Sequence, residues 1–424
     1  MNTNPRRVLY VTYDGLNEQL GQSQVLPYLR GLVKLGHRFE VISFEKPGSP
    51  LCYRKEHSEG ITWTALRYHK TPTLPATAFD MTQGLAAAGL ESILNRTDLI
   101  HVRSYVPCAL VLPCVEALRI PLLFDMRGLW ADERAEAGRW DAEGKQYKGT
   151  KAIERVLLRR ADAISVLTLR LQNYLRGDYP HAAEIGASIH TIPTCVDLDH
   201  FRPDVAPHAE TRAELGDAKV LLYLGAIGSY YLPREMANFY LAWRKYASPS
   251  RLLVVSRQDA TEIRDVLAEA GVAHELVYRS ATRAEVPSFV RCGHASFGLY
   301  RGRQLASYGT AATKTGETLA CGLPFASSVV GDVAVQLGNS PAGVSVSDER
   351  PETLDRAARE LAAKAFAPGV AAHARRLAES WYDLAPAVTA YDAIYRGMPR
   401  RHLAQTSLLD TSWPPSKGND AVAR

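Results

Sequence analysis

The chain is poor in cysteine and has no pattern that pairs the few it contains. Six cysteines are scattered among 424 residues, and no two of them form a Cys-x-x-Cys pair. The histidines do not gather at the spacing of metal ligands. This pattern argues against a disulfide framework or a structural zinc site, and it predicts reduced, mostly buried thiols in a cytoplasmic protein.

Long hydrophobic runs are also missing. No apolar segment approaches the roughly 20 residues that a membrane-spanning helix needs, and the N-terminal residues lead directly into a strand pattern. We therefore expect neither a signal peptide nor a membrane anchor. The net charge of +5 is mild. It permits contact with anionic lipid headgroups or phosphorylated substrates, and we expect no nucleic-acid partner.

A Gly-x-Gly-x-x-Gly string is absent, so the sequence does not indicate a dinucleotide cofactor, and we expect none. The composition is that of an ordinary globular protein, with 46% hydrophobic and 22% charged residues. A chain of 424 residues is too long for one hydrophobic core and suits two domains.

Residues 7–44 follow the pattern that opens a doubly wound α/β sheet. A buried strand pattern over Arg7–Thr12 precedes a glycine-bearing loop, a helix pattern over residues 23–35 and a second strand pattern over residues 39–44. In such sheets ligands bind beyond the carboxyl ends of the strands. Three residues of this loop are therefore candidate contacts for phosphates or for an acceptor hydroxyl: Gly15, Gly21 and Gln22.

Charged side chains accompany the ends of two further strand patterns, over residues 98–105 and 120–124. Neighbouring parallel strands end at one edge of a sheet, so we expect these side chains to face a common crevice. They are His101, Arg103 and Ser104 on the first strand, and Asp125, Arg127, Asp132 and Glu133 after the second. The alternative interpretation is a salt-bridge network on a domain surface.

Residues 150–160 have the pattern of a basic amphipathic helix. Lys151, Arg155 and Arg159 are interspersed with apolar residues such as Ile153 and Val156. Such a helix can lie on an anionic membrane surface, where a lipid-linked acceptor would be found. The alternative is a surface helix that packs by its apolar stripe.

The C-terminal half begins a second series of strands. A strand pattern over Lys219–Leu224 precedes a glycine loop and a helix pattern from about residue 234, and further strand patterns follow. Gly225 and Gly228 would let backbone N–H groups approach a diphosphate. Arg257 follows another strand and is a candidate phosphate contact.

The pattern of residues 312–324 predicts one short helix, and it contains residues typical of a helix start and a helix end. Thr313 is the expected N-cap, and Gly322 followed by Pro324 ends the helix. Lys314 and Glu317 are three residues apart and share a face near the N-terminus, where oriented N–H groups favour an anion. A cation facing phosphates and a carboxylate accepting from ribose hydroxyls would suit a nucleoside diphosphate. The alternative is a solvated ion pair on an ordinary helix.

Three strings together resemble the family-four retaining glycosyltransferases, which have the GT-B fold, and in particular their polysaccharide-type members. Thr-Lys-x-Gly-Glu-x-Leu-Ala-Cys-Gly-Leu-Pro at residues 313–324 resembles the donor-binding segment of that family. Gly-Gln-Ser-Gln at residues 21–24 resembles its opening loop, and Ile-Pro-x-x-Val-Asp at residues 192–197 is similar to the start of its interdomain linker. The last string places a domain boundary near residue 200.

The resemblance implies roles for individual residues. Glu317 would hold the ribose, and the helix N-terminus at Thr313 and Lys314 would face the diphosphate. Arg127 stands where relatives carry histidine or arginine and would act electrostatically, because arginine keeps its proton near pH 7. Many relatives have a second glutamate eight residues before the ribose-binding one, and this chain has Gly309 there.

The chain differs from the family at one further position and resembles it at another. Relatives often have aspartate after the arginine or histidine, and this chain has Gly128. Gly331-Asp332 resembles a turn that faces the sugar in the family.

The expected architecture is α/β, with two doubly wound Rossmann-like domains that face each other across a cleft. Residues 1–200 would form an acceptor-side domain and residues 201–380 a nucleotide-sugar-binding domain. Residues 381–398 would form a helix that crosses back to the first domain, and residues 399–424 a disordered tail.

The expected function is transfer of a hexosyl unit from a UDP- or GDP-hexose to a glycan or polyprenyl-linked glycan in bacterial-type polysaccharide biosynthesis, with retention of configuration. We expect Arg127 and Glu317 to be the catalytic residues, with no metal ion and no cofactor beyond the nucleotide-sugar co-substrate. The expected location is cytoplasmic, with peripheral contact at the inner face of the cell membrane. The alternatives are a nucleotide-sugar epimerase with the same fold and a non-catalytic protein that keeps it.

Overall fold

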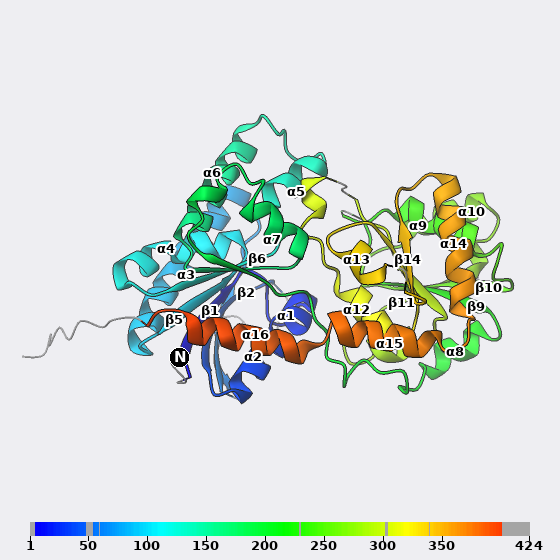
Figure 1. Cartoon of the computed structure of the whole chain (residues 1–424), viewed down its shortest axis with the longest axis horizontal. Helices are drawn as coiled ribbons and strands as arrows, with labels where there is room; N and C mark the ends of the chain where they lie inside the picture. Colours follow the sequence, from blue (N-terminus) through cyan, green and yellow to red (C-terminus); the bar gives the residue numbers. More distant parts are fainter. Residues whose placement is uncertain are drawn as a thin grey trace, which may run out of the picture.

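Two largely parallel β-sheets form the centres of two domains that follow each other along the chain (Figure 1). The computed structural model describes residues 5–47, 54–58, 60–228, 230–301, 304–338 and 340–400. The expected tail from residue 401 onward lies outside the described residues. The prediction of two doubly wound α/β domains is confirmed.

The first sheet has eight strands in the order β3-β4-β2-β1-β5-β6-β7-β8, and only the β3–β4 pair is antiparallel. Its central strands are continuous apolar runs, as expected for a parallel sheet with both faces covered. The strands are β1 (Arg7–Thr12), β2 (Arg38–Glu45), β3 (Arg54–Ser58), β4 (Ile61–Arg67), β5 (Leu99–Arg103), β6 (Leu122–Met126), β7 (Ala163–Val166) and β8 (Ser188–Thr191).

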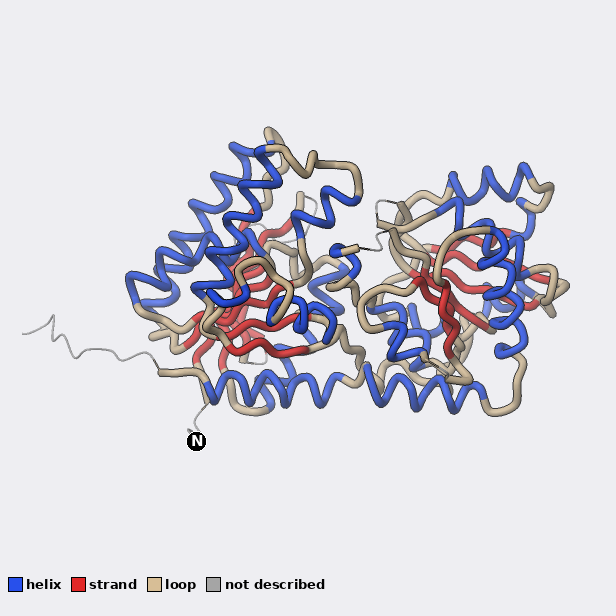
Figure 2. The backbone as a smooth tube through the Cα atoms, turned by 45° about the horizontal axis from the view of Figure 1, so that its top comes forward, coloured by secondary structure: helices blue, strands red, loops and turns tan. Residues whose placement is uncertain are grey.

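The helices of the first domain lie on both faces of this sheet (Figure 2). They are α1 (Gln19–Gln24), α2 (Leu26–Lys34), α3 (Thr73–Leu94), α4 (Tyr105–Leu118), α5 (Trp130–Glu136), α6 (Lys145–Arg160), α7 (Leu169–Arg176) and the short η1 (Ala182–Glu184). The helix expected over residues 23–35 is found as α2, which begins at Leu26 because a separate helix, α1, ends just before Val25. Pro27 lies in the first turn of α2, where its missing N–H leaves no intrahelical hydrogen bond unmade.

The second sheet has six parallel strands in the order β11-β10-β9-β12-β13-β14. The strands are β9 (Lys219–Leu224), β10 (Ser250–Val255), β11 (Leu276–Arg279), β12 (Ala295–Gly298), β13 (Phe325–Ser328) and β14 (Gly343–Val346). Its helices are α8 (Ala209–Leu215), α9 (Pro233–Trp243), α10 (Thr261–Glu269), η2 (Ala273–Glu275), α11 (Val286–Val290), η3 (Leu305–Ser307), α12 (Thr313–Ala320), α13 (Val333–Leu337), α14 (Pro351–Ala365) and α15 (Val370–Trp381).

The last helix, α16 (Leu384–Gly397), returns to the first domain and lies beside α2 (Figure 1). The helix expected over residues 381–398 is therefore found, but it begins at Leu384, because α15 ends at Trp381 and Asp383 caps the new helix by accepting from the N–H of Ala385 at 3.1 Å. The two helices approach closely, because a Cβ added to Gly31 would lie 2.6 Å from Val388 Cγ2. The first hydrophobic core is therefore completed by a segment from the far end of the chain.

None of the helices in the described ranges combines the length and apolarity that crossing a membrane requires.

Candidate functional site

A cavity of about 300 Å³ opens between the two domains at the carboxyl ends of their strands. The first domain contributes three residues of the loop and helix after β1, and the second contributes the ends of β9, β10 and β11 together with α12. The lining residues are Asn17, Gln19 and Gln22 on one side, and Leu224, Gly225, Ala226, Val255, Ser256, Arg257, Gln258, Ala281, Arg283, Val286 and Glu317 on the other. Of the predicted donor contacts, Gln22, Gly225, Arg257 and Glu317 meet here.

The loop after β1, which contributes Asn17 to the cavity, is fixed by hydrogen bonds to a buried carboxylate. The buried carboxylate of Glu45 accepts from the N–H of Leu16 at 2.6 Å and from the Ser43 hydroxyl at 2.7 Å. Gly21 packs so tightly on the backbone carbonyl of Gly15 that a Cβ could not fit between them. Gly15 and Gly21 are therefore packed within this loop, and neither is among the residues that line the cavity, so their predicted contact with the donor is not found.

Two arginines and one carboxylate give the cavity its charge. Arg283 donates to Glu317 Oε1 through Nη1 at 3.0 Å, and Glu317 is only 7% exposed. Arg257 lines the same cavity and donates through Nε to a backbone carbonyl. Sequence analysis missed the site role of Arg283. The strand-end rule that selected Arg257 after β10 would have selected Arg283 in the segment after β11, had that rule been applied to each strand in turn.

Lys314 does not line the cavity but lies directly behind it. Its ammonium donates to the Tyr223 hydroxyl at 2.9 Å and sits over the rings of Tyr223 and Tyr231, 4.2 and 4.1 Å from their centroids. Burial lowers the pKa of Lys314 well below its usual value. Gly225 separates it from the cavity, since a Cβ at that position would be 3.3 Å from Lys314 Nζ. The expectation that its side chain faces the cleft is therefore wrong for this structure.

Gly228 also lies outside the cavity lining, at a positive φ of 75° that favours glycine.

Thr313 links the two domains instead of capping α12. The N-cap position is Ala312, without a side-chain hydrogen bond, so the predicted Thr313 cap is wrong. The Thr313 hydroxyl accepts from Gln24 Nε2 at 2.9 Å. The same amide presents its Oε1 to Arg103 Nη2 at 2.7 Å and to Arg127 Nη2 at 2.8 Å. One glutamine of α1 thus connects the arginine pair of the first domain to the start of α12.

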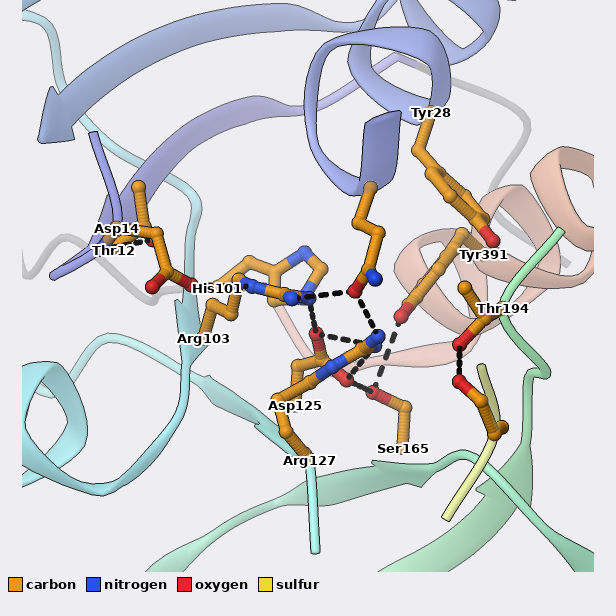
Figure 3. Close-up of polar contacts among 12 residues, drawn as sticks. Thr12, Asp14, Tyr28, His101, Arg103, Asp125, Arg127, Ser165, Thr194 and Tyr391 are labelled. Atoms are coloured by element: carbon orange, nitrogen blue, oxygen red, sulfur yellow. Dashed lines mark hydrogen bonds and ion pairs between the residues drawn. The ribbon is translucent and has the colours of Figure 1, made fainter. Parts of the chain in front are cut away.

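The arginine pair surrounds a buried carboxylate (Figure 3). Asp125 accepts from Arg127 Nη1 at 3.3 Å and from Arg103 Nη1 at 3.5 Å, and Arg103 also pairs with Asp14 at 3.0 Å. Burial by itself raises the pKa of Asp125, but Arg127 and Arg103 outweigh burial and hold it below its usual value. The predicted meeting of Arg103, Asp125 and Arg127 at one strand edge is therefore found, and the group stays charged.

His101 lies deeper, where it packs against α16 and not against a ligand space between the domains. Its Nδ1 is 2.7 Å from the Tyr395 hydroxyl, and the side chain is 3% exposed. Burial lowers its pKa to about 4, so the ring is neutral at pH 7. His101 does line a small cavity together with Asp125 and Arg127, as expected, but α16 covers this part of the sheet. Ser104, by contrast, sits at the strand end with a φ of 73°, which is uncommon outside glycine.

Asp132 and Glu133 point in different directions from α5. Asp132 accepts from the Tyr147 hydroxyl at 2.8 Å and from Lys151 Nζ at 3.0 Å, so it fastens α5 to α6 and does not join the arginine cluster. Glu133 is partly buried, and its carboxylate lies beside Gly128, the residue after Arg127.

The Gly331-Asp332 turn holds the opposite domain. The Asp332 carboxylate accepts from the N–H groups of Leu169 at 2.6 Å and Arg170 at 3.1 Å, at the N-terminus of α7. Such a contact satisfies donors that a helix start leaves open. The Asp332 carboxylate is therefore engaged by α7, and a sugar contact by this turn stays a prediction.

The two glycines that differ from the family pattern meet each other. A Cβ added to Gly309 would lie only 2.7 Å from the Cα atom of Gly128. These positions form a backbone-to-backbone contact between the domains, and there is no room at either for an acidic side chain without movement.

The sequence contains one string of carboxylates that could bind a metal ion and that the expectation of no metal ion left out. The chain contains an Asp-x-Asp string, Asp197-Leu198-Asp199, which the metal-free expectation did not weigh. Asp197 Oδ1 accepts from the N–H groups of Asp199 and His200 at 2.9 and 3.2 Å, as in a local turn of the linker. Among the described residues no group of three or more His, Cys, Asp or Glu side chains is arranged to hold a metal ion.

Comparisons with known proteins point in one direction. Residues 22–200 match the model of Glycosyltransferase Family 4, which confirms the resemblance over these residues. No curated protein sequence shows a significant match to the chain.

Solved structures resemble the chain over nearly its whole length. Sucrose-phosphate synthase from Thermosynechococcus elongatus superposes with a TM-score of 0.70 at 16% identity, covering 92% of this chain and 98% of that one. HepE from Anabaena in complex with UDP and glucose has a TM-score of 0.66 at 11% identity, covering 92% and 99%. A glycosyltransferase from Rickettsia africae has a TM-score of 0.66 at 13% identity, covering 93% and 98%. These likenesses confirm the GT-B fold.

Proposed function

Because residues 22–200 form a Glycosyltransferase Family 4 domain, we propose that the protein transfers a hexosyl unit from a nucleoside-diphosphate sugar to a glycan or lipid-linked glycan. The observation that carries this proposal is the interdomain cavity with Arg257, Arg283 and Glu317 on its wall. Similar folds hold UDP with glucose, as in HepE from Anabaena.

The chemistry of the cavity suits a leaving diphosphate. Negative charge grows on the diphosphate as its bond to the sugar breaks, and fixed cationic groups stabilise that charge. Arg257 and Arg283 supply two guanidinium groups in the cavity, and Lys314 adds an amine just behind Gly225. Glu317 offers carboxylate oxygens to ribose hydroxyls. We propose that these protein groups act without a metal ion and that configuration is retained, the latter on the family domain alone.

The arginine cluster of the first domain lies across from α12. Arg127 is held by Asp125 and Gln24, and Gln24 also contacts Thr313. We assign Arg127 an electrostatic role toward the sugar end of the donor, because a guanidinium does not give up its proton near pH 7.

The test is release of nucleoside diphosphate from a panel of UDP- and GDP-hexoses, with and without glycan and polyprenyl-linked acceptors. We expect one donor to release its diphosphate, faster with the right acceptor, and to yield a glycosylated product. Conversion of the donor into its epimer without diphosphate release would support an epimerase instead. Donor binding without any turnover would support a non-catalytic protein.

We further propose that α6 rests on an anionic membrane. Its outer face combines exposed Lys145 and Arg159 with Ile153 and Val156, which are 47% and 44% exposed. A groove of about 630 Å³ beside it is lined by further cations, including Lys151 and Arg155. Cations near an anionic surface contribute about 1 kcal/mol each.

Charge reversal tests this membrane proposal. Lys145→Glu with Arg159→Glu is expected to lower binding to vesicles of phosphatidylglycerol and phosphatidylcholine at least about 10-fold, because two attractions of about 1 kcal/mol each are lost. Co-sedimentation measures it. The matched control is Arg356→Glu with Arg359→Glu on α14 of the other domain, which we expect to bind like the wild type. Equal binding by all three proteins would contradict the proposal.

A further inference from the structure

The outer face of α3 carries apolar side chains where a surface helix normally carries charged ones. All 22 residues of α3 are described, and its two charged side chains are both buried, Asp80 at 0% and Glu91 at 7% exposed. On the opposite side, residues that recur every fourth position are exposed and uncharged. The large apolar residues among the exposed ones are 51% to 77% exposed, and they are Leu74, Phe79, Leu90, Ile93 and Leu94. The usual pattern of an amphipathic surface helix is therefore reversed.

The two buried carboxylates have partners inside the first domain. Asp80 accepts from the Tyr13 hydroxyl at 2.8 Å and lies 2.6 Å from His69 Nδ1. Glu91 accepts from Asn95 Nδ2 at 2.7 Å. These contacts fix the rotation of α3 about its axis, so its apolar side stays turned outward. A contiguous apolar face of this kind marks an interaction surface.

The helices beside α3 add positive charge to this surface. α4 lies between α3 and α6 on one face of the first sheet (Figure 1). The fully described helices α4 and α6 contain two acidic residues, of which Glu154 is buried and Glu116 pairs with Arg160. The exposed cations Lys145 and Arg159 of α6 therefore face no free carboxylate on these two helices.

An anionic bilayer suits both parts of this surface. Apolar side chains enter the boundary between headgroups and acyl chains, and cations contact the headgroups. Lys70 before α3 and Arg96 after it are exposed, at the two ends of the apolar face, where long cationic side chains reach headgroups. The cations beside α3 favour an anionic lipid surface over a second copy of this chain, which would bring like charges together.

We propose that α3 lies in the plane of an anionic membrane with its apolar face inserted among the acyl chains, an inference that rests on the membrane contact proposed for α6. The cations of α6 attract the protein to the surface, and α3 supplies the apolar contact that holds it there.

Neutral substitutions on α3 separate insertion from charge attraction. Leu90→Gln with Leu94→Gln changes two exposed residues into good helix formers without altering the charge. Co-sedimentation with vesicles of phosphatidylglycerol and phosphatidylcholine is measured at about 0.1 M and about 1 M salt, where the screening length falls from about 10 Å to about 3 Å. The wild type should keep binding at the higher salt, and the double variant should lose at least about 10-fold of that affinity. Val335→Gln, at a residue 68% exposed in the second domain, is the control and should bind like the wild type.

A tryptophan on the apolar face reports its depth. The fluorescence that Ile93→Trp adds to the signal of the six native tryptophans should be quenched by vesicles with bromine-labelled acyl chains. The fluorescence added by Val335→Trp should not be quenched. These readouts do not use the transferase reaction, so they are independent of whether diphosphate release is found.

The outcomes distinguish this inference from the one on α6. A wild type that loses all binding at about 1 M salt, or Ile93→Trp without quenching, would overturn insertion of α3 and leave the charge contact of α6 standing. A wild type that binds no vesicles even at about 0.1 M salt would overturn both membrane proposals. Sedimentation equilibrium that finds a dimeric wild type and a monomeric Leu90→Gln, Leu94→Gln variant would also overturn the inference, because the face would then bind a second copy of the chain.

Discussion

Glu317→Gln is expected to weaken binding of the nucleoside-diphosphate donor by about 10- to 100-fold. Hydrogen bonds to a charged group contribute about 1.5–3 kcal/mol, and each 1.4 kcal/mol corresponds to about a factor of ten in Kd. The carboxylate is 7% exposed and faces the cavity. It is therefore placed to accept from ribose hydroxyls with little competition from water. Isothermal titration with the donor or with the free nucleoside diphosphate measures the change.

A double-mutant cycle with Arg283 tests whether the pair acts as a unit. Arg283→Ala leaves the Glu317 carboxylate without its 3.0 Å partner, so the two substitutions should be strongly non-additive. Glu275→Gln is the matched control, because Glu275 pairs with Arg244 at 2.7 Å in the same domain but does not line the cavity. Donor affinity that survives both Glu317→Gln and Arg283→Ala would contradict the assignment of this cavity to the donor.

Gly309→Glu is expected to lower turnover by about two orders of magnitude while the protein stays folded. A Cβ at this position comes within 2.7 Å of the Cα atom of Gly128, and a backbone atom of β6's terminal loop cannot swing aside. The domains must then part at this contact. A displacement of about 1 Å between reacting groups can cost about 100-fold in rate. The substitution would thus be harmful although it restores the residue that the family pattern has there.

Steady-state kinetics and small-angle scattering check this prediction together. The scattering profile of Gly309→Glu should show a more open arrangement, and its melting temperature should stay near that of the wild type. Gly186→Glu serves as control, because a Cβ at that loop residue would meet no atom within 4 Å. Full activity in Gly309→Glu would mean that the contact of Gly128 with Gly309 is not part of the active arrangement.

The sequence predicts most of this fold because most strands and helix ends follow from local patterns of apolar residues and glycines. Apolar runs of strand length marked the core strands of both sheets, and the glycine stop at Gly322 marked the end of α12 correctly. The rule that neighbouring parallel strands end at one edge of a sheet correctly predicted that Arg103, Asp125 and Arg127 lie together. Some helix boundaries were misplaced by a few residues, such as the start of α16, which the Asp383 cap sets at Leu384.

The candidate site was less predictable because the positions of its side chains depend on contacts with residues far away in the sequence. Thr313 has no capping role because Gln24 of the other domain binds its hydroxyl. Lys314 is drawn into a pocket of tyrosines that come from different loops and strands. His101 is covered by Tyr395, which is 294 positions later. A sequence pattern within one helix or strand does not predict such long-range contacts.

The return of α16 has a consequence for how the protein is made. Its tyrosines Tyr391 and Tyr395 seal the face of the first sheet that bears His101 and Tyr10. Ribosomes build the chain from the other end, so the amino-terminal half emerges with this apolar face uncovered. It waits through the synthesis of the entire second domain before its own last helix exists. The first domain therefore cannot complete this part of its core until α16 has been synthesised, long after its last strand, β8, has been made.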